Sequence, residues 1–128
     1  MKNSLLSLAK ADLATASLIL ENPKNEGLFG MVCFHAQQTV EKALKYYIEF
    51  SGEDYPFIHN LETLLEISEK YNSDLVHFAE QVKILTGYYS DPRYDFLAPI
   101  NQSKEEAQEA YNMAEEIYNF IYRLISNK

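Results

Sequence analysis

Residues 28–52 of this chain read LFGMVCFHAQQTVEKALKYYIEFSG and predict its longest helix. The apolar residues recur three or four positions apart, a spacing that places them on one face of an α-helix. The breadth of this face indicates a central, buried helix. Its members are Phe29, Val32, Cys33, Ala36, Val40, Ala43, Leu44 and Tyr47.

Four other segments carry the same helical spacing, and the sequence has no strand-like alternation or internal repeat. We expect these helices over about residues 3–21, 59–71, 74–89 and 103–125. Proline interrupts the chain between them at Pro23, Pro56 and Pro92. Long amphipathic helices with short connections favour antiparallel neighbours. The predicted fold class is therefore all-α, an up-and-down bundle of four to five helices in a single domain over residues 1–128.

Polar residues at the expected helix starts predict N-caps. Asn3 or Ser4 is expected to cap the first helix, and Asn60 the third. Ser103, followed three residues later by Glu106, is a capping box. The last helix is therefore the best defined of the five.

The composition is that of a globular protein with an acidic surface. The chain has 128 residues, of which 47% are hydrophobic, and a formal net charge of -8. This charge repels free nucleic acid and anionic membranes, so any polyanion site must be local. The sequence has no apolar run of membrane-spanning length and no secretory signal at its start, which predicts a cytoplasmic protein with no membrane contact. The single Cys33 is expected to be packed and unreactive.

An antiparallel bundle brings basic residues from three helices to one end. The end of the second helix, the start of the third and the end of the fourth carry Lys45, His59 and Arg93. Such groups bind phosphate through charge-assisted hydrogen bonds. We therefore expect any anion site to form where these three residues converge.

Residues 33–45, CFHAQQTVEKALK, resemble the signature helix of HEPN domains, an all-α nucleotide-binding family. Further pieces at residues 11–14, 59–65 and 88–94 occur in the family's order, so the resemblance covers nearly the whole chain. It implies a bundle of four or five helices that is often a homodimer.

The resemblance also implies three functional settings. One is a metal-independent ribonuclease that acts as a toxin, often paired with a small nucleotidyltransferase antitoxin. Another is a non-catalytic subunit that binds nucleotide or RNA beside such a nucleotidyltransferase. The third is a stand-alone domain, which includes a structural homodimer without ligand.

The ribonuclease members carry arginine, four to six further residues and then histidine, and this chain lacks that motif. The positions after Arg93 that would hold the histidine are Ala98, Pro99 and Ile100, and no histidine follows His77. We therefore predict no catalytic residue. The alternative is a divergent ribonuclease toxin in which a displaced histidine, His59, acts from another helix.

Each candidate residue also has a structural explanation. His35 is expected to bond a carboxylate of a neighbouring helix, such as that of Asp12, in a structural role. His59 is either part of a ligand site or a turn histidine packed on Tyr55 or Phe57.

Arg93 is the leading ligand candidate, although it also has neighbours that it could pack on or pair with. Tyr89 and Tyr94 flank it, so cation–π packing competes with phosphate binding. Tyr94 matches only loosely the tyrosine that the partner nucleotidyltransferase modifies in some toxins of the family. The predicted nucleotide or RNA site consists of Gln38, Glu41, Lys45, His59, Arg93 and Tyr94.

The sequence has no glycine-rich phosphate loop and no metal-ligand spacing of cysteine or histidine, so we expect no cofactor and no metal. The resemblance then favours a non-catalytic, homodimeric HEPN-type protein that binds nucleotide or RNA, pairs with a minimal nucleotidyltransferase, or does both, in a toxin–antitoxin-like system. The acidity of the chain favours a partner with a basic surface.

Overall fold

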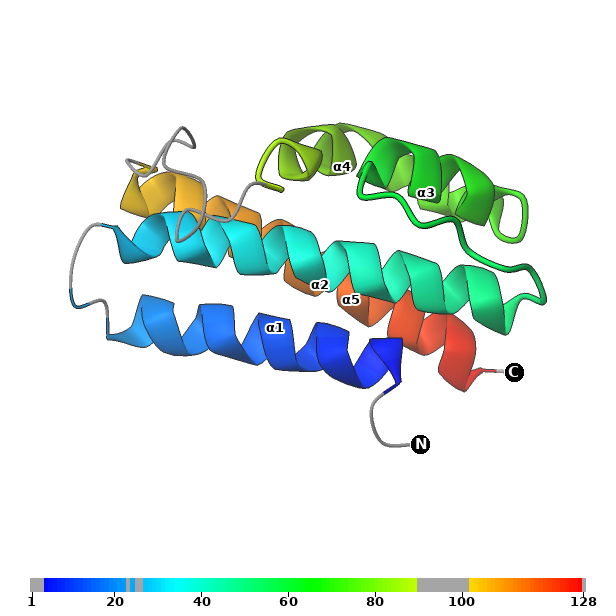
Figure 1. Ribbon diagram of the computed structural model, residues 1–128, viewed down its shortest axis with the longest axis horizontal. Coiled ribbons are helices and arrows are strands. Elements are labelled where there is room, and N and C mark those ends of the chain that lie inside the picture. Colours follow the sequence, from blue (N-terminus) through cyan, green and yellow to red (C-terminus); the bar gives the residue numbers. More distant parts are fainter. Residues whose placement is uncertain (1–3, 23, 25–26, 90–101, 128) are drawn as a thin grey trace.

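The computed structural model describes residues 4–22, 24, 27–89 and 102–127, and these form an all-α bundle (Figure 1). The prediction of an all-α bundle is confirmed. The helices are α1 (Leu5–Glu21), α2 (Leu28–Phe50), α3 (Leu61–Glu69), the 3₁₀ helix η1 (Ser73–Phe78), α4 (Ala79–Thr86) and α5 (Lys104–Ser126).

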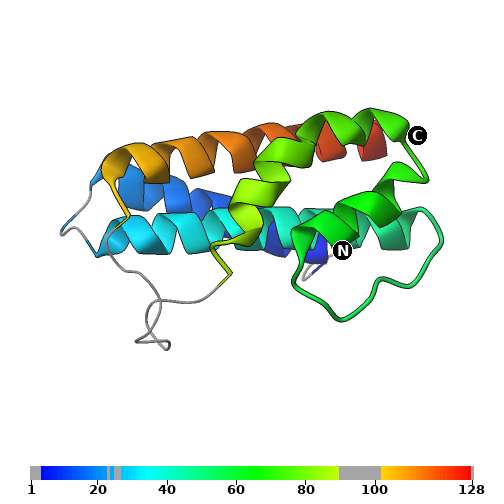
Figure 2. The same cartoon turned by 90° about the horizontal axis from the view of Figure 1, so that it is seen from above.

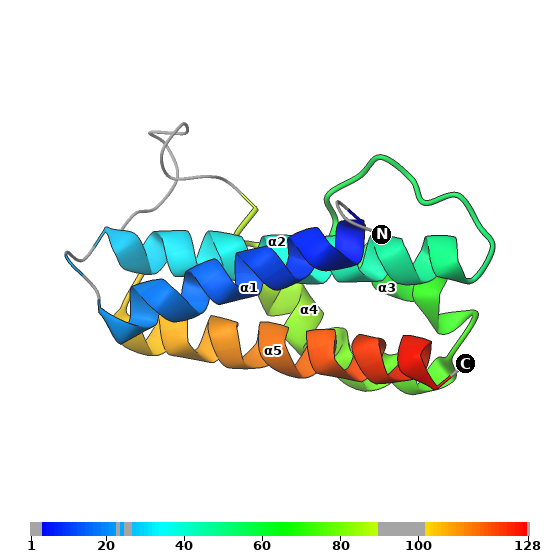
Figure 3. The ribbon, with the colours of Figure 1, turned by 90° about the horizontal axis from the view of Figure 1, so that it is seen from below.

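Helix α2 lies at the centre of the bundle, as its broad apolar face predicts. It packs against α1 on one side, α5 on another, and α3 and α4 on a third. Helices α1 and α2 are antiparallel, and α5 runs in the same direction as α2 (Figures 1 and 3). The fully buried side chains of α2 that fill this core include Val32, Val40, Leu44 and Ile48.

The segment between α2 and α3 folds back along α2. At its start Gly52 has a φ of 100°, a left-handed conformation that glycine adopts without a steric penalty. Figure 2 shows the segment leaving the end of α2 and returning before α3 begins. The start of α3 therefore lies beside the second half of α2 and not at its end, where the sequence-based topology placed it.

The fourth helix differs from its prediction as one α-helix over residues 74–89. The structure has a 3₁₀ helix, η1, followed by the shorter α4. The Asn72 side chain accepts a hydrogen bond from the backbone N–H of Asp74, which starts a tight turn. Leu75 and Phe78 are both buried, and their separation of three residues suits the three-residue turn of a 3₁₀ helix.

The predicted N-caps of the other helices are confirmed. Of the two residues predicted as alternatives at the start of α1, Ser4 is the N-cap, and its side chain accepts a hydrogen bond from the backbone N–H of Ser7. Asn60 caps α3, and Ser103 forms both hydrogen bonds of the predicted capping box at α5.

Cys33 is buried in the core on α2, as predicted. Burial, together with the nearby charge of Glu106, raises the pKa of its thiol to about 12 despite a hydrogen bond with Tyr88. The thiol is therefore protonated at neutral pH and unreactive. No helix among the described residues is long and apolar enough to cross a membrane.

Candidate functional site

A buried carboxylate on α2, that of Glu41, is the centre of the candidate site. Its Oε2 accepts hydrogen bonds from Lys45 Nζ at 3.0 Å and from His59 Nδ1 at 2.9 Å. Its Oε1 accepts a hydrogen bond from Gln37 Nε2 at 3.1 Å. Residues 37, 41 and 45 are one helical turn apart, so they share one face of α2.

These contacts hold Glu41 in its charged form. Burial alone would raise the pKa of the carboxyl group, but the hydrogen bonds from Gln37, His59 and Lys45 and the charge of Lys45 lower it below its ordinary value of 4.5. Because the carboxylate is an acceptor only, the Nδ1 of His59 must carry the proton that it donates. The other ring nitrogen, Nε2, is then turned away from Glu41.

His59 reaches Glu41 from the segment just before α3. Its neighbour Asn60 caps that helix, and the N–H of Leu61 donates a hydrogen bond to Thr86 Oγ1 at 2.9 Å. This bond joins the start of α3 to the end of α4. The imidazole ring stacks on Tyr89 with ring centroids 4.3 Å apart. Among the described residues the stacking partner of His59 is therefore Tyr89, and not Tyr55 or Phe57, the two rings named in the structural alternative for this residue.

His59 and Tyr89 remain open to solvent, whereas Lys45 does not. The side chain of His59 is 51% exposed, and Tyr89 is also exposed. Lys45 retains only 8% of its accessible surface, and its ammonium lies 5.5 Å from the centroid of the Tyr55 ring. The cluster thus presents an imidazole and a phenol to solvent, whereas the charge of its buried lysine is compensated by Glu41.

Lys45 and His59 lie close together, as the sequence predicts, although they meet beside the second half of α2 and not at the end of the bundle. Each donates its own hydrogen bond to Glu41. Gln38 lies at the edge of the cluster, where it donates to Gln37 Oε1 at 2.7 Å, and no hydrogen bond joins it to Glu41 among the described residues. Arg93 and Tyr94 lie outside the described residues.

Two members of the cluster, Gln37 and Tyr89, were missed as site residues by the sequence reasoning. Gln37 is fully buried and also donates to the backbone oxygen of His59 at 3.3 Å. Its spacing of four residues from Glu41 was the available signal. No spacing in the sequence links Tyr89 to His59, because their contact depends on how α3 and α4 pack.

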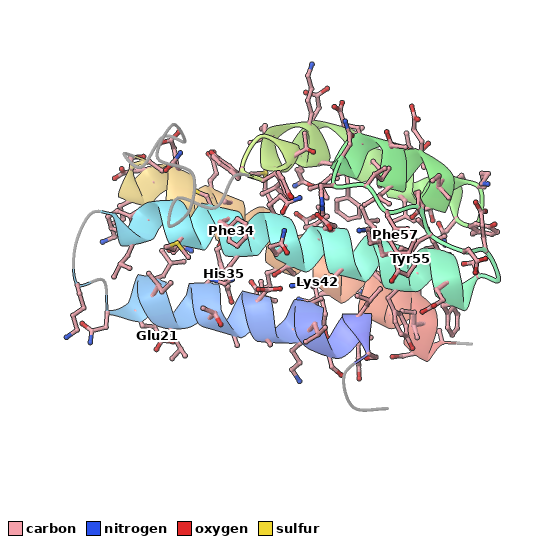
Figure 4. All side chains as sticks on the ribbon, in the orientation of Figure 1. Glu21, Phe34, His35, Lys42, Tyr55 and Phe57 are labelled. Atoms are coloured by element: carbon pink, nitrogen blue, oxygen red, sulfur yellow. The ribbon has the colours of Figure 1, made fainter. Side chains whose placement is uncertain are left out.

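A second charged cluster joins α1 to α2. The carboxylate of Asp12 accepts hydrogen bonds from His35 Nδ1 at 2.8 Å and Lys42 Nζ at 2.5 Å, which confirms the predicted bond between Asp12 and His35. Figure 4 shows His35 and Lys42 on the side of α2 that faces α1. Burial would raise the pKa of Asp12, but these two partners lower it below 3.8. This cluster accounts for the structural role expected of His35.

The described residues contain no group of three or more histidine, cysteine, aspartate or glutamate side chains placed to hold a metal ion. The chemistry available at the Glu41 cluster is hydrogen bonding through His59 Nε2 and stacking on exposed aromatic rings. Aromatic faces and hydrogen-bonding side chains are the groups with which proteins bind single nucleotides and unpaired bases.

Comparison with known proteins places the chain in a family. The HEPN domain model matches residues 3–125. The protein TT1696 from Thermus thermophilus is 27% identical and has a similar structure, with a TM-score of 0.74 over 96% of this chain and 98% of that one. ST0689, an archaeal HEPN homologue, is 23% identical and shares the fold with a TM-score of 0.74 over 98% and 99% of the two chains. No curated protein matches significantly. The chain therefore belongs to the HEPN domain family.

Proposed function

We propose that this protein is a non-catalytic HEPN subunit that pairs with a minimal nucleotidyltransferase and presents a nucleotide or RNA site around His59. The system would be a two-component one of the toxin–antitoxin type, with a homodimer of this chain as its helical part. The proposed site keeps the predicted residues and adds the exposed ring beside His59. Its members are Gln38, Glu41, Lys45, His59, Tyr89, Arg93 and Tyr94.

The observation that carries the proposal is the fixed and exposed imidazole of His59. Glu41 holds its Nδ1, and the ring of Tyr89 lies against its face at 4.3 Å. Such an arrangement leaves Nε2 of the neutral ring to accept a hydrogen bond from a base amino group or a ribose hydroxyl, and it leaves an exposed aromatic ring on which a base can stack.

Lys45 plays an indirect part in this site. Its charge is compensated by Glu41 and its ammonium is buried, so it does not reach a phosphate. It holds the carboxylate that orients His59. The cation that meets a phosphate is then Arg93, which follows Tyr89 by four residues in the sequence.

The charge of the chain supports a protein partner. With a formal net charge of -8, the surface attracts basic proteins and repels free RNA away from the local site. The pairing with nucleotidyltransferases that the HEPN resemblance implies suits a basic partner surface, because opposite potentials speed association and fix orientation.

Replacing Arg93 by alanine is expected to weaken nucleotide binding by at least about tenfold, because a charge-assisted bond to phosphate is lost. Isothermal titration of the protein with ATP and with a short single-stranded RNA measures the effect. Arg123→Ala is the matched control, since the second arginine of the chain lies on α5 and is exposed. Equal affinity of Arg93→Ala and the parent would remove Arg93 from the site, and the absence of heat with both ligands would favour a structural homodimer.

A divergent ribonuclease is the second candidate, and one observation favours it. A carboxylate bonded to histidine Nδ1 orients Nε2 as a general base, and Glu41 and His59 have this geometry at 2.9 Å. Incubation with RNA in the presence of a chelator tests for metal-independent cleavage. Cleavage that disappears in His59→Ala and persists in His77→Ala would establish the enzyme. Intact RNA with all three proteins is the result that our proposal predicts.

A further inference from the structure

A second candidate site lies beyond the C-terminal half of α2, away from the Glu41 cluster. It is a cavity of about 290 Å³ lined by Glu49, Asp54, Tyr55 and Phe57. The rings of Tyr55 and Phe57 meet edge to face, with centroids 6.0 Å apart and planes at 76°. Figure 4 shows both side chains together on the segment that folds back along α2.

The fold does not explain the position of Phe57. Its side chain is 93% exposed, the largest exposed fraction among the large hydrophobic residues of the described chain. Phenylalanine and tyrosine are enriched at protein–protein interfaces, so an open ring beside a cavity is available to a partner. Its only aromatic contact among the described residues is the edge contact with Tyr55.

The cavity is also acidic. Glu49 and Asp54 are both exposed, and neither forms an ion pair within the part of the chain that the structure describes. Two carboxylates beside two aromatic rings attract a cation, because the negative faces of the rings add to the charge of the carboxylates. Lys45 already places its ammonium 5.5 Å from the centroid of the Tyr55 ring, so the chain itself uses this ring for a cation–π contact.

We propose that this cavity binds the guanidinium group of an arginine side chain from a partner protein. A guanidinium is planar, stacks on aromatic rings and donates paired hydrogen bonds to carboxylates, so it matches both kinds of group that line the cavity. The carboxylates exclude a nucleic acid backbone. They also disfavour a second copy of this chain, since two acidic surfaces would face each other.

The proposal is independent of the nucleotide site, because it involves none of the residues assigned to nucleotide binding. The cavity would contact a basic partner protein, whereas the site at His59 would bind nucleotide or RNA. A failed nucleotide titration would therefore leave it intact, and a failure of the experiment below would leave the nucleotide site intact.

Amide NMR titration of the protein with the peptide acetyl-Gly-Arg-Gly-amide tests the proposal. We expect saturable shifts confined to residues 49–58. The same peptide with citrulline in place of arginine has nearly the same shape and no charge, and we expect it to cause no saturable shift. Phe57→Ala and Glu49→Gln should each weaken binding of the arginine peptide by about two- to fivefold. Glu66→Gln, which removes an exposed carboxylate on α3, should leave the affinity unchanged.

Three results would overturn the proposal. Equal shifts with the citrulline peptide would show that charge is not recognised. Shifts spread over the whole acidic surface and unaffected by Phe57→Ala would show general charge attraction without a cavity. Tighter binding of spermidine or tetramethylammonium than of the arginine peptide would assign the cavity to a small organic cation and not to a protein side chain. Circular dichroism checks the fold of each variant. Because Phe57 and Glu49 are exposed, we expect the spectra of their variants to match that of the parent.

Discussion

Replacing Glu41 by alanine is expected to lower the free energy of unfolding by about 3–5 kcal/mol. The loss comes mainly from Lys45, which is only 8% exposed and loses the carboxylate that compensates its ammonium group. Gln37 loses one acceptor and retains the backbone oxygen of His59. Urea unfolding followed by circular dichroism at pH 7 measures the change.

The double variant Glu41→Leu with Lys45→Met separates this explanation from a general loss of packing. It removes both charges and fills the same space with apolar groups, so we expect most of the lost stability to return. Glu53→Ala is the control, because Glu53 also binds a lysine, Lys70, but at the surface, where its removal should have a far smaller effect. A small loss of stability in Glu41→Ala, equal to the loss in Glu53→Ala, would show that Lys45 reaches water and is not held by Glu41.

Replacing Asp12 by alanine is expected to destabilise the protein by about 2–3 kcal/mol, because one carboxylate accepts two charge-assisted hydrogen bonds from α2. The effect is smaller than at Glu41, since the side chain of Lys42 is 25% exposed and can turn toward water. Asp74→Ala, which removes an exposed aspartate, is the control. An equal and small change in both variants would mean that the cluster does not join α1 to α2.

Both carboxylates should also make stability depend on pH in the acid range. Hydrogen bonds and nearby positive charge lower the folded-state pKa values of Asp12 and Glu41 from their ordinary values of 3.8 and 4.5. A lowered pKa contributes stability that is complete above the ordinary value and declines as the pH falls toward the folded-state value. Unfolding free energies at a series of pH values below 5 should therefore fall less steeply for the double variant Asp12→Asn with Glu41→Gln than for the parent. Equal slopes of unfolding free energy against pH in the parent and the double variant would contradict the lowered pKa values of Asp12 and Glu41.

The sequence predicts those parts of the fold that local chemistry determines. The apolar spacing of residues 28–50 locates α2, and the N-caps Ser4, Asn60 and Ser103 need only their own helices. The bond between Asp12 and His35 was also predictable, because antiparallel neighbours α1 and α2 bring a carboxylate opposite a histidine.

The remaining features depend on tertiary packing that periodicity does not encode. The segment after Gly52 folds back along α2, and this path, not helix order alone, brings His59 to Glu41 and Tyr89. The replacement of one expected helix by η1 and α4 has a similar cause, since Leu75 and Phe78 are buried three residues apart. The cavity beside Phe57 likewise arises from the path of that segment.

The central claim is that this chain functions as the helical partner of a nucleotidyltransferase. The most direct test is to tag the protein at its own chromosomal locus, purify it under mild conditions and identify co-purifying proteins by mass spectrometry, with an untagged strain as the control. We predict a nucleotidyltransferase in a defined stoichiometric ratio to this chain. Recovery of the protein alone, at normal expression and with its helical fold intact, would contradict the account.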